Sequence, residues 1–197
     1  MKSKTVLFLL VALLLAACSL GKSHDTGTGS SPIGDTRTGG GPCKNVDICT
    51  VIPQSQVNAS LGITARFTSP DEPTNMGSMT SDQCSYNAGA SEPGMHVELL
   101  RQCSPEAIYA SANYQSSKEA YLARGGTRTE LSGVGDKAFY ETVPGMEGTT
   151  LPPKVRLVAY KVNVYVILSD SWAPADQDAM VKQGLTSFAN TLLTSSH

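Results

Sequence analysis

The sequence VRLVAYKVNVYVILS, residues 155–169, is rich in β-branched and aromatic side chains. Such residues favour extended backbone, so two strands are predicted, Val155 to Tyr160 and Val164 to Ser169. The residues between them, Lys161 to Asn163, suffice for a short turn in which asparagine tolerates a positive φ. Because a turn this short joins antiparallel strands, the stretch predicts a β-hairpin.

Further strand signals lie on both sides of this hairpin. Residues Met95 to Arg101 alternate apolar and polar side chains, and Gln83 to Asn87 precede them across the segment Gly89 to Gly94, which predicts a second hairpin. Shorter strands are predicted at Ala65 to Thr68 and at Ala138 to Glu141. The segment between Thr68 and Gln83 is predicted to be a loop.

Three segments carry helix signals. Pro53 to Leu61 begins with proline and is followed by a glycine. A long helix begins at Ser104-Pro105-Glu106, where a hydroxyl cap is followed by proline and an acid, and it ends before Gly125-Gly126. A third helix opens near Pro174 and is predicted to pack its apolar stripe on the sheet. The members of that stripe are Val181, Leu185, Phe188 and Leu192.

These elements define the fold class. Strands that arrive as hairpins, with helices between and after them, predict an α+β fold: an antiparallel sheet of about five or six strands with about three helices packed on it. Residues 43–197 have the usual length of one globular domain.

The N-terminus carries an export signal. Lys2 and Lys4 precede a short apolar run that ends in Leu15-Ala16-Ala17-Cys18, the pattern of a lipoprotein signal peptide. The apolar run is shorter than the roughly 20 residues that a membrane-spanning helix requires. Residues 1–17 are therefore predicted to be cleaved, and Cys18 is predicted to be lipidated and to hold the mature protein at a cell membrane or outer membrane, on its extracytoplasmic side.

Residues 18–42 are predicted to be the lipidated cysteine and a flexible linker, because glycine, serine and threonine dominate there and little apolar surface can be buried. A coil of about 24 residues reaches about 25 to 30 Å, enough to hold the domain clear of the lipid headgroups.

The charge of the chain argues against nucleic acid as a partner. The full sequence has 15 basic and 17 acidic residues, and loss of the signal leaves 13 basic residues and a net charge of −4. Phosphate backbones require clustered lysine and arginine, and the sequence contains no such cluster.

Four cysteines remain after Cys18: Cys43, Cys49, Cys84 and Cys103. An even number of cysteines in an oxidising compartment predicts two disulfides, for which three connectivities are possible. A four-cysteine metal site is the alternative, but paired CxxC spacing is missing, so no metal site and no cofactor are predicted.

Catalytic motifs are missing from the sequence. Neither GxSxG nor HExxH occurs, and His24, His96 and His197 lie in the linker, a strand and the C-terminus. His96 beside Glu98 is interpreted as a solvent-facing strand histidine. Gly133-Val134-Gly135-Asp136 precedes a strand and is interpreted as a turn. Asp71-Glu72, flanked by prolines, is interpreted as a solvated loop.

Aromatic residues supply one possible ligand cleft. Trp172, the single tryptophan, follows the last predicted strand and could lie beside Tyr160 or Tyr165, or fill one end of the core.

Three short patterns resemble a known family. Cys49 before the Pro53–Gly62 helix, Cys84-Ser85-Tyr86 at a strand, and the stretch from Gly133 to Tyr140 are similar to DUF3558-like lipoproteins of actinobacteria. More distantly, the layout resembles the extracellular sensor domains of mycobacterial Ser/Thr kinases. The resemblance implies a disulfide from Cys49 to Cys84, leaving Cys43 to pair with Cys103, a compact sheet with helices packed on it, and no known catalytic residues.

The sequence therefore predicts a lipid-anchored lipoprotein of the cell envelope, a non-catalytic module that binds an unidentified ligand or protein. Two alternatives remain open: an envelope hydrolase with an atypical site near His96, and a structural accessory subunit.

Overall fold

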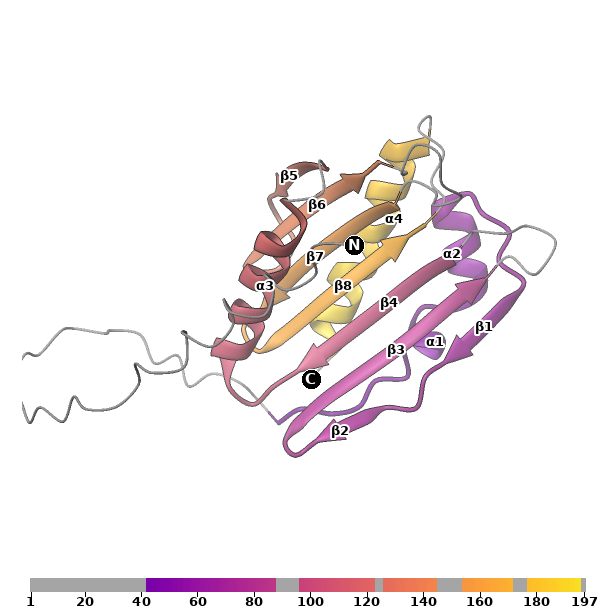
Figure 1. The fold of residues 1–197 in the computed structure, drawn as a ribbon. Coiled ribbons are helices and arrows are strands. Elements are labelled where there is room, and N and C mark those ends of the chain that lie inside the picture. Colours follow the sequence, from indigo (N-terminus) through magenta and orange to yellow (C-terminus); the bar gives the residue numbers. More distant parts are fainter. Residues whose placement is uncertain (1–41, 88–95, 123–125, 145–153, 172–176, 196–197) are drawn as a thin grey trace, which may run out of the picture. The chain divides into compact units, whose positions relative to one another are not determined.

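The structure is a computed structural model that describes residues 42–87, 96–122, 126–144, 154–171 and 177–195. Within these ranges the chain forms eight strands and four helices (Figure 1). In chain order they are α1 (Ile48–Val51), α2 (Gln54–Leu61), β1 (Phe67–Pro70), β2 (Thr74–Met76), β3 (Met79–Asn87), β4 (His96–Cys103), α3 (Ala107–Leu122), β5 (Thr127–Leu131), β6 (Lys137–Val143), β7 (Lys154–Lys161), β8 (Val164–Asp170) and α4 (Asp178–Thr194). The α+β class is confirmed, with more strands and one more helix than predicted.

All strands belong to one antiparallel sheet. Its order is β1-β3-β4-β8-β7-β6-β5, and β2 pairs with β3 beyond the end of β1. The two predicted hairpins are confirmed: Tyr160 pairs with Tyr165 between β7 and β8, and Asn87 pairs with His96 between β3 and β4. Pairing of β4 with β8 joins the two hairpins at the centre of the sheet.

Helices cover both faces of the sheet. In Figure 1, α3 crosses one face and α4 lies behind the opposite face. The alternation of side chains along β7 explains this arrangement, because Leu157 and Ala159 belong to the core under α4, while Val158 lies in a second, smaller cluster with Tyr114 of α3. Both clusters therefore share the same strands.

The larger core is built on α4. All four residues of the predicted stripe are fully buried, namely Val181, Leu185, Phe188 and Leu192. Helix α4 packs against α2, β7 and β8, and the same core continues to α1, β3 and β4. The predicted role of this helix is confirmed.

The smaller core lies under α3. The Tyr114 ring packs against Phe139 and Tyr160, with centroid distances of 5.4 and 5.2 Å. Burial would leave its hydroxyl unpaired, but the hydroxyl donates a hydrogen bond of 3.1 Å to the Glu130 carboxylate. The α3 helix is thereby attached to both β6 and β5.

The turn between β7 and β8 differs from the prediction. The positive φ belongs to Val162, at 52°, and not to Asn163. Two contacts explain why Val162, and not Asn163, adopts the positive φ. The Val162 amide donates a 2.7 Å hydrogen bond to Asp136, and the buried Asn163 amide nitrogen lies 3.5 Å from the Cys103 sulfur. Asn163 is thus held by the disulfide, and valine occupies the position that asparagine usually takes.

Three short elements were not predicted. α1 is a single turn capped by Asp47, which accepts a hydrogen bond from the Thr50 amide. β2 occupies part of the segment predicted as a loop, because Gly77, with φ of 68°, allows a tight turn back into β3. β5 has the polar sequence TRTEL and lies at the sheet edge, so it lacks the apolar alternation that identifies buried strands.

Some sequence-based predictions concern residues outside the described ranges. These are the signal peptide, Cys18, His24 and most of the linker, together with Trp172, Pro174 and His197. Among the helices of the described part, none has the length and apolar character needed to cross a membrane.

Gly184 provides a test of the packing between α2 and α4. A Cβ atom added there would lie 2.8 Å from the Ser60 carbonyl oxygen and 2.6 Å from a Leu61 methyl group. We expect Gly184→Ala to lower the free energy of unfolding by about 1 to 2 kcal/mol, because overpacking outweighs the gain of about 1 kcal/mol in helix propensity.

Urea denaturation of the disulfide-bonded protein measures this effect, with Gln183→Ala as the control. Gln183 is an exposed neighbour on the same helix, so its substitution should change stability by less than about 0.5 kcal/mol. Equal or higher stability of the Gly184→Ala variant would contradict the described contact.

Candidate functional site

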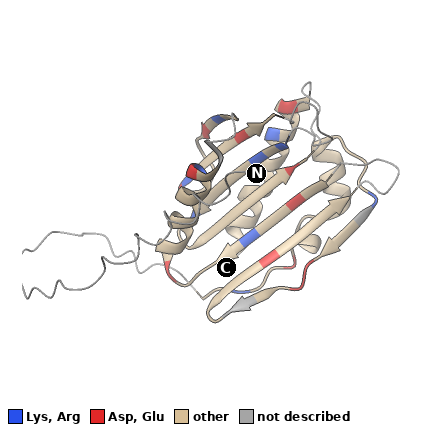
Figure 2. Ribbon diagram, in the orientation of Figure 1, with Lys and Arg blue, Asp and Glu red and all other residues tan. Residues whose placement is uncertain are grey.

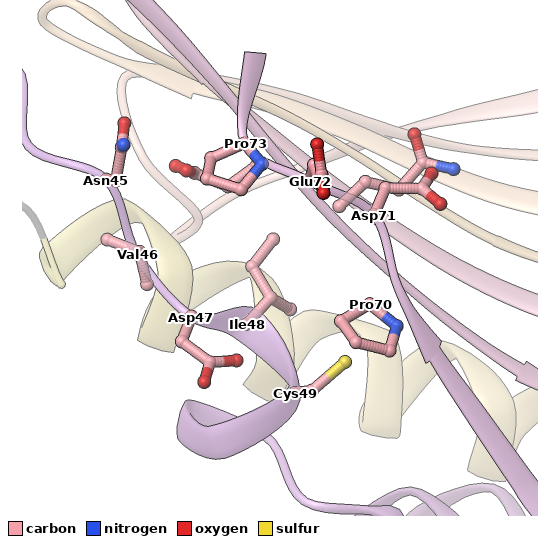
Figure 3. A pocket seen from close by; sticks show the side chains of 11 residues that line it. Asn45, Val46, Asp47, Ile48, Cys49, Pro70, Asp71, Glu72 and Pro73 are labelled. Carbon is pink, nitrogen blue, oxygen red and sulfur yellow. The ribbon is translucent and has the colours of Figure 1, made fainter. Parts of the chain in front are cut away.

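One hollow among the described residues is a groove of about 570 Å³. Asn45–Cys49 form one wall and Pro70–Pro73 the other, as Figure 3 shows. Asp82 and Gln83 of β3 also line the groove. Its volume lies within the range of sites that hold small ligands or a few residues of a peptide.

Two disulfides fix the first wall. Residues 42–47 form neither helix nor strand, and Cys43 is bonded to Cys103 at the end of β4, while Cys49 is bonded to Cys84 in β3. These are the pairs that the family resemblance implies. Because the two bonds join the wall to neighbouring strands, the wall keeps its position without strand pairing of its own.

A buried ion pair lies beneath this wall. Arg101 donates a 2.9 Å hydrogen bond to Asp82, and both side chains are almost inaccessible to solvent. Figure 2 shows the corresponding basic band of β4 beside the acidic band of β3. The same guanidinium group reaches the carbonyl oxygen of Lys44 at 3.3 Å. Arg101 thus connects the sheet to the wall.

Burial sets the electrostatics of the pair. Desolvation raises the pKa of Asp82, against the lowering influence of the Val46 backbone and of Arg101. Desolvation likewise lowers the pKa of Arg101. In the described part of the chain, Oδ1 of Asp82 makes no hydrogen bond that satisfies normal geometry. The buried Asp82 carboxylate beneath the groove is therefore held mainly by Arg101.

Acidic side chains line the groove walls. Asp71 and Glu72 are exposed on one wall, and Asp47 is exposed on the other. Hydrogen bonds from Thr50 lower the pKa of Asp47, so this carboxylate stays ionised at neutral pH. The apolar side chains between the acids are mainly those of Val46, Pro70 and Pro73. The chemistry of the groove is therefore acidic and partly apolar.

A second hollow of about 470 Å³ adjoins the groove, and Asn45 lines both. It is formed by Pro42, Cys43, Gly77, Ser78, Thr80 and Pro105. The Thr80 hydroxyl is buried and has no hydrogen-bond partner among the described residues. Both hollows thus follow β3 along the wall formed by residues 42–49.

The tyrosines of the predicted cleft lie elsewhere. Tyr165 is 3% exposed, and its hydroxyl lies 2.5 Å from that of Ser117, beneath α3. Tyr160 lies opposite Tyr165 and packs against Tyr114. The structure therefore brings these two tyrosines together in the smaller core, while Trp172 lies outside the described residues.

His96 is a partly exposed residue at the start of β4. Its Nδ1 atom lies 2.8 Å from the Asn87 side-chain oxygen, and its Nε2 atom lies 3.9 Å from a carboxylate oxygen of Glu98. The described hydrogen bonds of its ring involve no serine or aspartate. His96 does not line either of the two large hollows.

The acidic residues that line the groove belong to no sequence motif, so the sequence alone did not identify them as a site. Asp71-Glu72 were interpreted as solvated loop residues, and they are exposed. Their proximity to Asp47 depends on the fold, because Asp71 follows Asp47 by 24 positions in the chain. Within the described residues, no three His, Cys, Asp or Glu side chains lie close enough to hold a metal ion.

Comparisons with known proteins include a likeness to a solved structure. No protein-family model matches the chain, and no curated protein matches it. The chain is similar to the crystal structure of the extracellular domain of PknH from Mycobacterium tuberculosis, with 13% sequence identity and a TM-score of 0.41. The match covers 70% of this chain and 91% of that chain. Membership of the DUF3558-like family stays a prediction.

The Arg101–Asp82 pair provides a test of the groove's support. Arg101→Met should lower the free energy of unfolding by about 3 to 5 kcal/mol, because it leaves a carboxylate buried without its counter-charge. The double variant Arg101→Met/Asp82→Asn removes both charges and should recover much of this loss.

Denaturation at neutral pH compares the two variants. A double variant that is no more stable than the single variant would show that the ion pair is not the reason for the loss.

Proposed function

We propose that this protein is an extracytoplasmic, lipid-anchored binding module whose ligand occupies the groove between Asn45–Cys49 and Pro70–Pro73. The observation that carries the proposal is the groove itself, a hollow of about 570 Å³ whose wall is attached to the sheet by two disulfides. A wall held in this way is organised before the ligand arrives, which reduces the entropy lost on binding.

The disulfides also support the proposed location. Cys43–Cys103 and Cys49–Cys84 use all the cysteines of the folded part, and such bonds persist in oxidising compartments outside the cytoplasm. The predicted lipid on Cys18 would keep the module at the membrane surface. Both features suit an envelope protein: the compartment keeps the disulfides oxidised, and the anchor keeps the protein at the membrane.

The lining of the groove selects the ligand chemistry. Asp47, Asp71 and Glu72 attract a cationic group, and Val46 and Pro73 offer apolar contact. Electrostatic complementarity of this kind increases association rates and specificity. A ligand that combines an amine or guanidinium group with an apolar part, such as a basic peptide segment, fits both features.

The lipid anchor is tested by substitution of Cys18. In cells that produce the full chain, Cys18→Ala should abolish metabolic labelling with palmitate and leave the precursor uncleaved, because the thiol is the proposed acceptor. The control chain keeps Cys18 and carries His24→Ala, a change in the linker that should preserve labelling. Palmitate labelling that persists in the Cys18→Ala chain would contradict the anchor.

The groove is tested with a short peptide of alternating lysine and leucine. We expect this probe to shift the NMR amide signals of residues 45–49, and the Asp71→Asn/Glu72→Gln variant should weaken binding, because two exposed carboxylates are lost. Glu106→Gln is the matched control: Glu106 is an exposed acid that does not line the groove, so binding should be unchanged.

A second probe separates charge from simple adhesion. A peptide of alternating glutamate and leucine has the same apolar content and the opposite charge, and it should not bind. Equal binding of both peptides, or shifts confined to other parts of the sheet, would refute the proposed site.

A further inference from the structure

Four large apolar side chains of the described residues are substantially exposed: Ile108 at 68%, Tyr109 at 48%, Val162 at 38% and Met180 at 37%. Ile108 and Tyr109 are adjacent at the start of α3, and Val162 is at the tip of the β7–β8 turn. Isolated exposed apolar residues are common on soluble proteins, so their distribution decides whether they have a common role.

Three of the four lie at one end of the domain. Pro42, the first described residue, lines the same hollow as Pro105, which lies three residues before Ile108. The buried Asn163, next to Val162, has its amide nitrogen 3.5 Å from the Cys103 sulfur and 3.9 Å from the Cys43 sulfur. Ile108, Tyr109 and Val162 therefore lie near the Cys43–Cys103 disulfide, where the chain that follows Cys18 enters the fold.

Figure 1 shows the same arrangement. The first described residues, the start of α3 and the turn between β7 and β8 lie at one end of the sheet, and the start of α4 lies at the other. Met180 belongs to that other end, where its side chain approaches Gly62 after α2. The exposed apolar residues are therefore distributed unequally between the two ends.

Val162 has an additional feature. Its φ of 52° is unfavourable for a β-branched residue, and glycine or asparagine would be the usual choice in such a turn. The hydrogen bond from its amide to Asp136 fixes this conformation. The turn therefore holds an apolar side chain at its tip, where 38% of it is exposed.

The charges around this end are mixed. Lys44 and Lys161 are exposed next to the chain entry and the β7–β8 turn, and Glu106 and Asp136 are exposed nearby. Asp136 is engaged by the Val162 amide. The positive and negative charges balance here, so the apolar and tyrosine side chains are the feature of this end that suits a lipid surface.

We propose that this end of the domain, formed by Ile108, Tyr109 and Val162, contacts the lipid bilayer to which the protein is anchored. The inference rests on the lipid anchor of the proposed function. The linker that leads to Pro42 keeps the end near the membrane at high effective concentration, so even a weak insertion of three side chains orients the domain. Tyrosine suits the interface between lipid and water because its ring is apolar and its hydroxyl hydrogen-bonds to water.

Photo-crosslinking in intact cells tests the contact. The full chain carries p-benzoylphenylalanine in place of Tyr109, and the matched control carries it in place of Met180. Both are exposed apolar positions in helices, at opposite ends of the domain. After irradiation, mass spectrometry should find a phospholipid adduct at position 109 and none above the unirradiated background at position 180.

The outcomes separate the two proposals. Equal lipid adducts at both positions, or protein adducts in place of lipid at position 109, would overturn the membrane contact. Palmitate labelling of the same chains is recorded in parallel. If labelling is present and the adduct at position 109 is missing, the contact fails while the anchor stands, whereas loss of labelling refutes the anchor.

A second variant tests whether the photo-crosslinker itself, and not the neighbouring apolar side chains, produces the lipid contact. Ile108→Ser/Val162→Asn keeps the crosslinker at position 109 but removes the neighbouring apolar surface, and both changes are at exposed positions. The lipid adduct should decrease strongly. An unchanged yield would show that proximity to the membrane, and not contact by these side chains, produces the adduct.

Discussion

The attachment of residues 42–49 to the sheet is the constraint on which the other functional features depend. Before Ile48 this segment forms neither helix nor strand, and two disulfides and Arg101 hold it. In the chain-entropy description, closing loops of 35 and 60 residues stabilises the folded state by roughly 4 kcal/mol each. Without these bonds, one wall of the groove and the point of chain entry would lose their fixed places.

Buried charges give the sheet a second kind of constraint. On the α4 side, Asp82 pairs with Arg101, and on the α3 side, Glu141 accepts hydrogen bonds from Arg128 at 3.2 Å and Arg156 at 2.7 Å. Arg128 also lies over the Phe139 ring, 4.4 Å from its centroid. Removal of one partner in such a group leaves an unpaired charge in the interior, so these pairs penalise strand registers other than the observed one.

The parts of the fold that the sequence predicts are those with a strong local pattern. Valine-rich strands and the stripe from Val181 to Leu192 identify themselves by periodicity, because burial on one face imposes it. The polar strand β5 and the single turn α1 have no such pattern, since edge pairing and a side-chain cap suffice to form them. The positive φ at Val162 is fixed by Asp136, which lies 26 residues away in the chain.

The groove is harder to predict for the same reason. Its exposed acids come from a helix cap and a loop, and tertiary structure alone places Asp47 and Glu72 in the lining of one groove. The groove and the apolar end share the segment that begins at Pro42, because Asn45 lines both hollows and Pro42 lies beside Pro105. A domain oriented at this end would hold a ligand of the groove close to the bilayer, since the ligand contacts the same rigid segment.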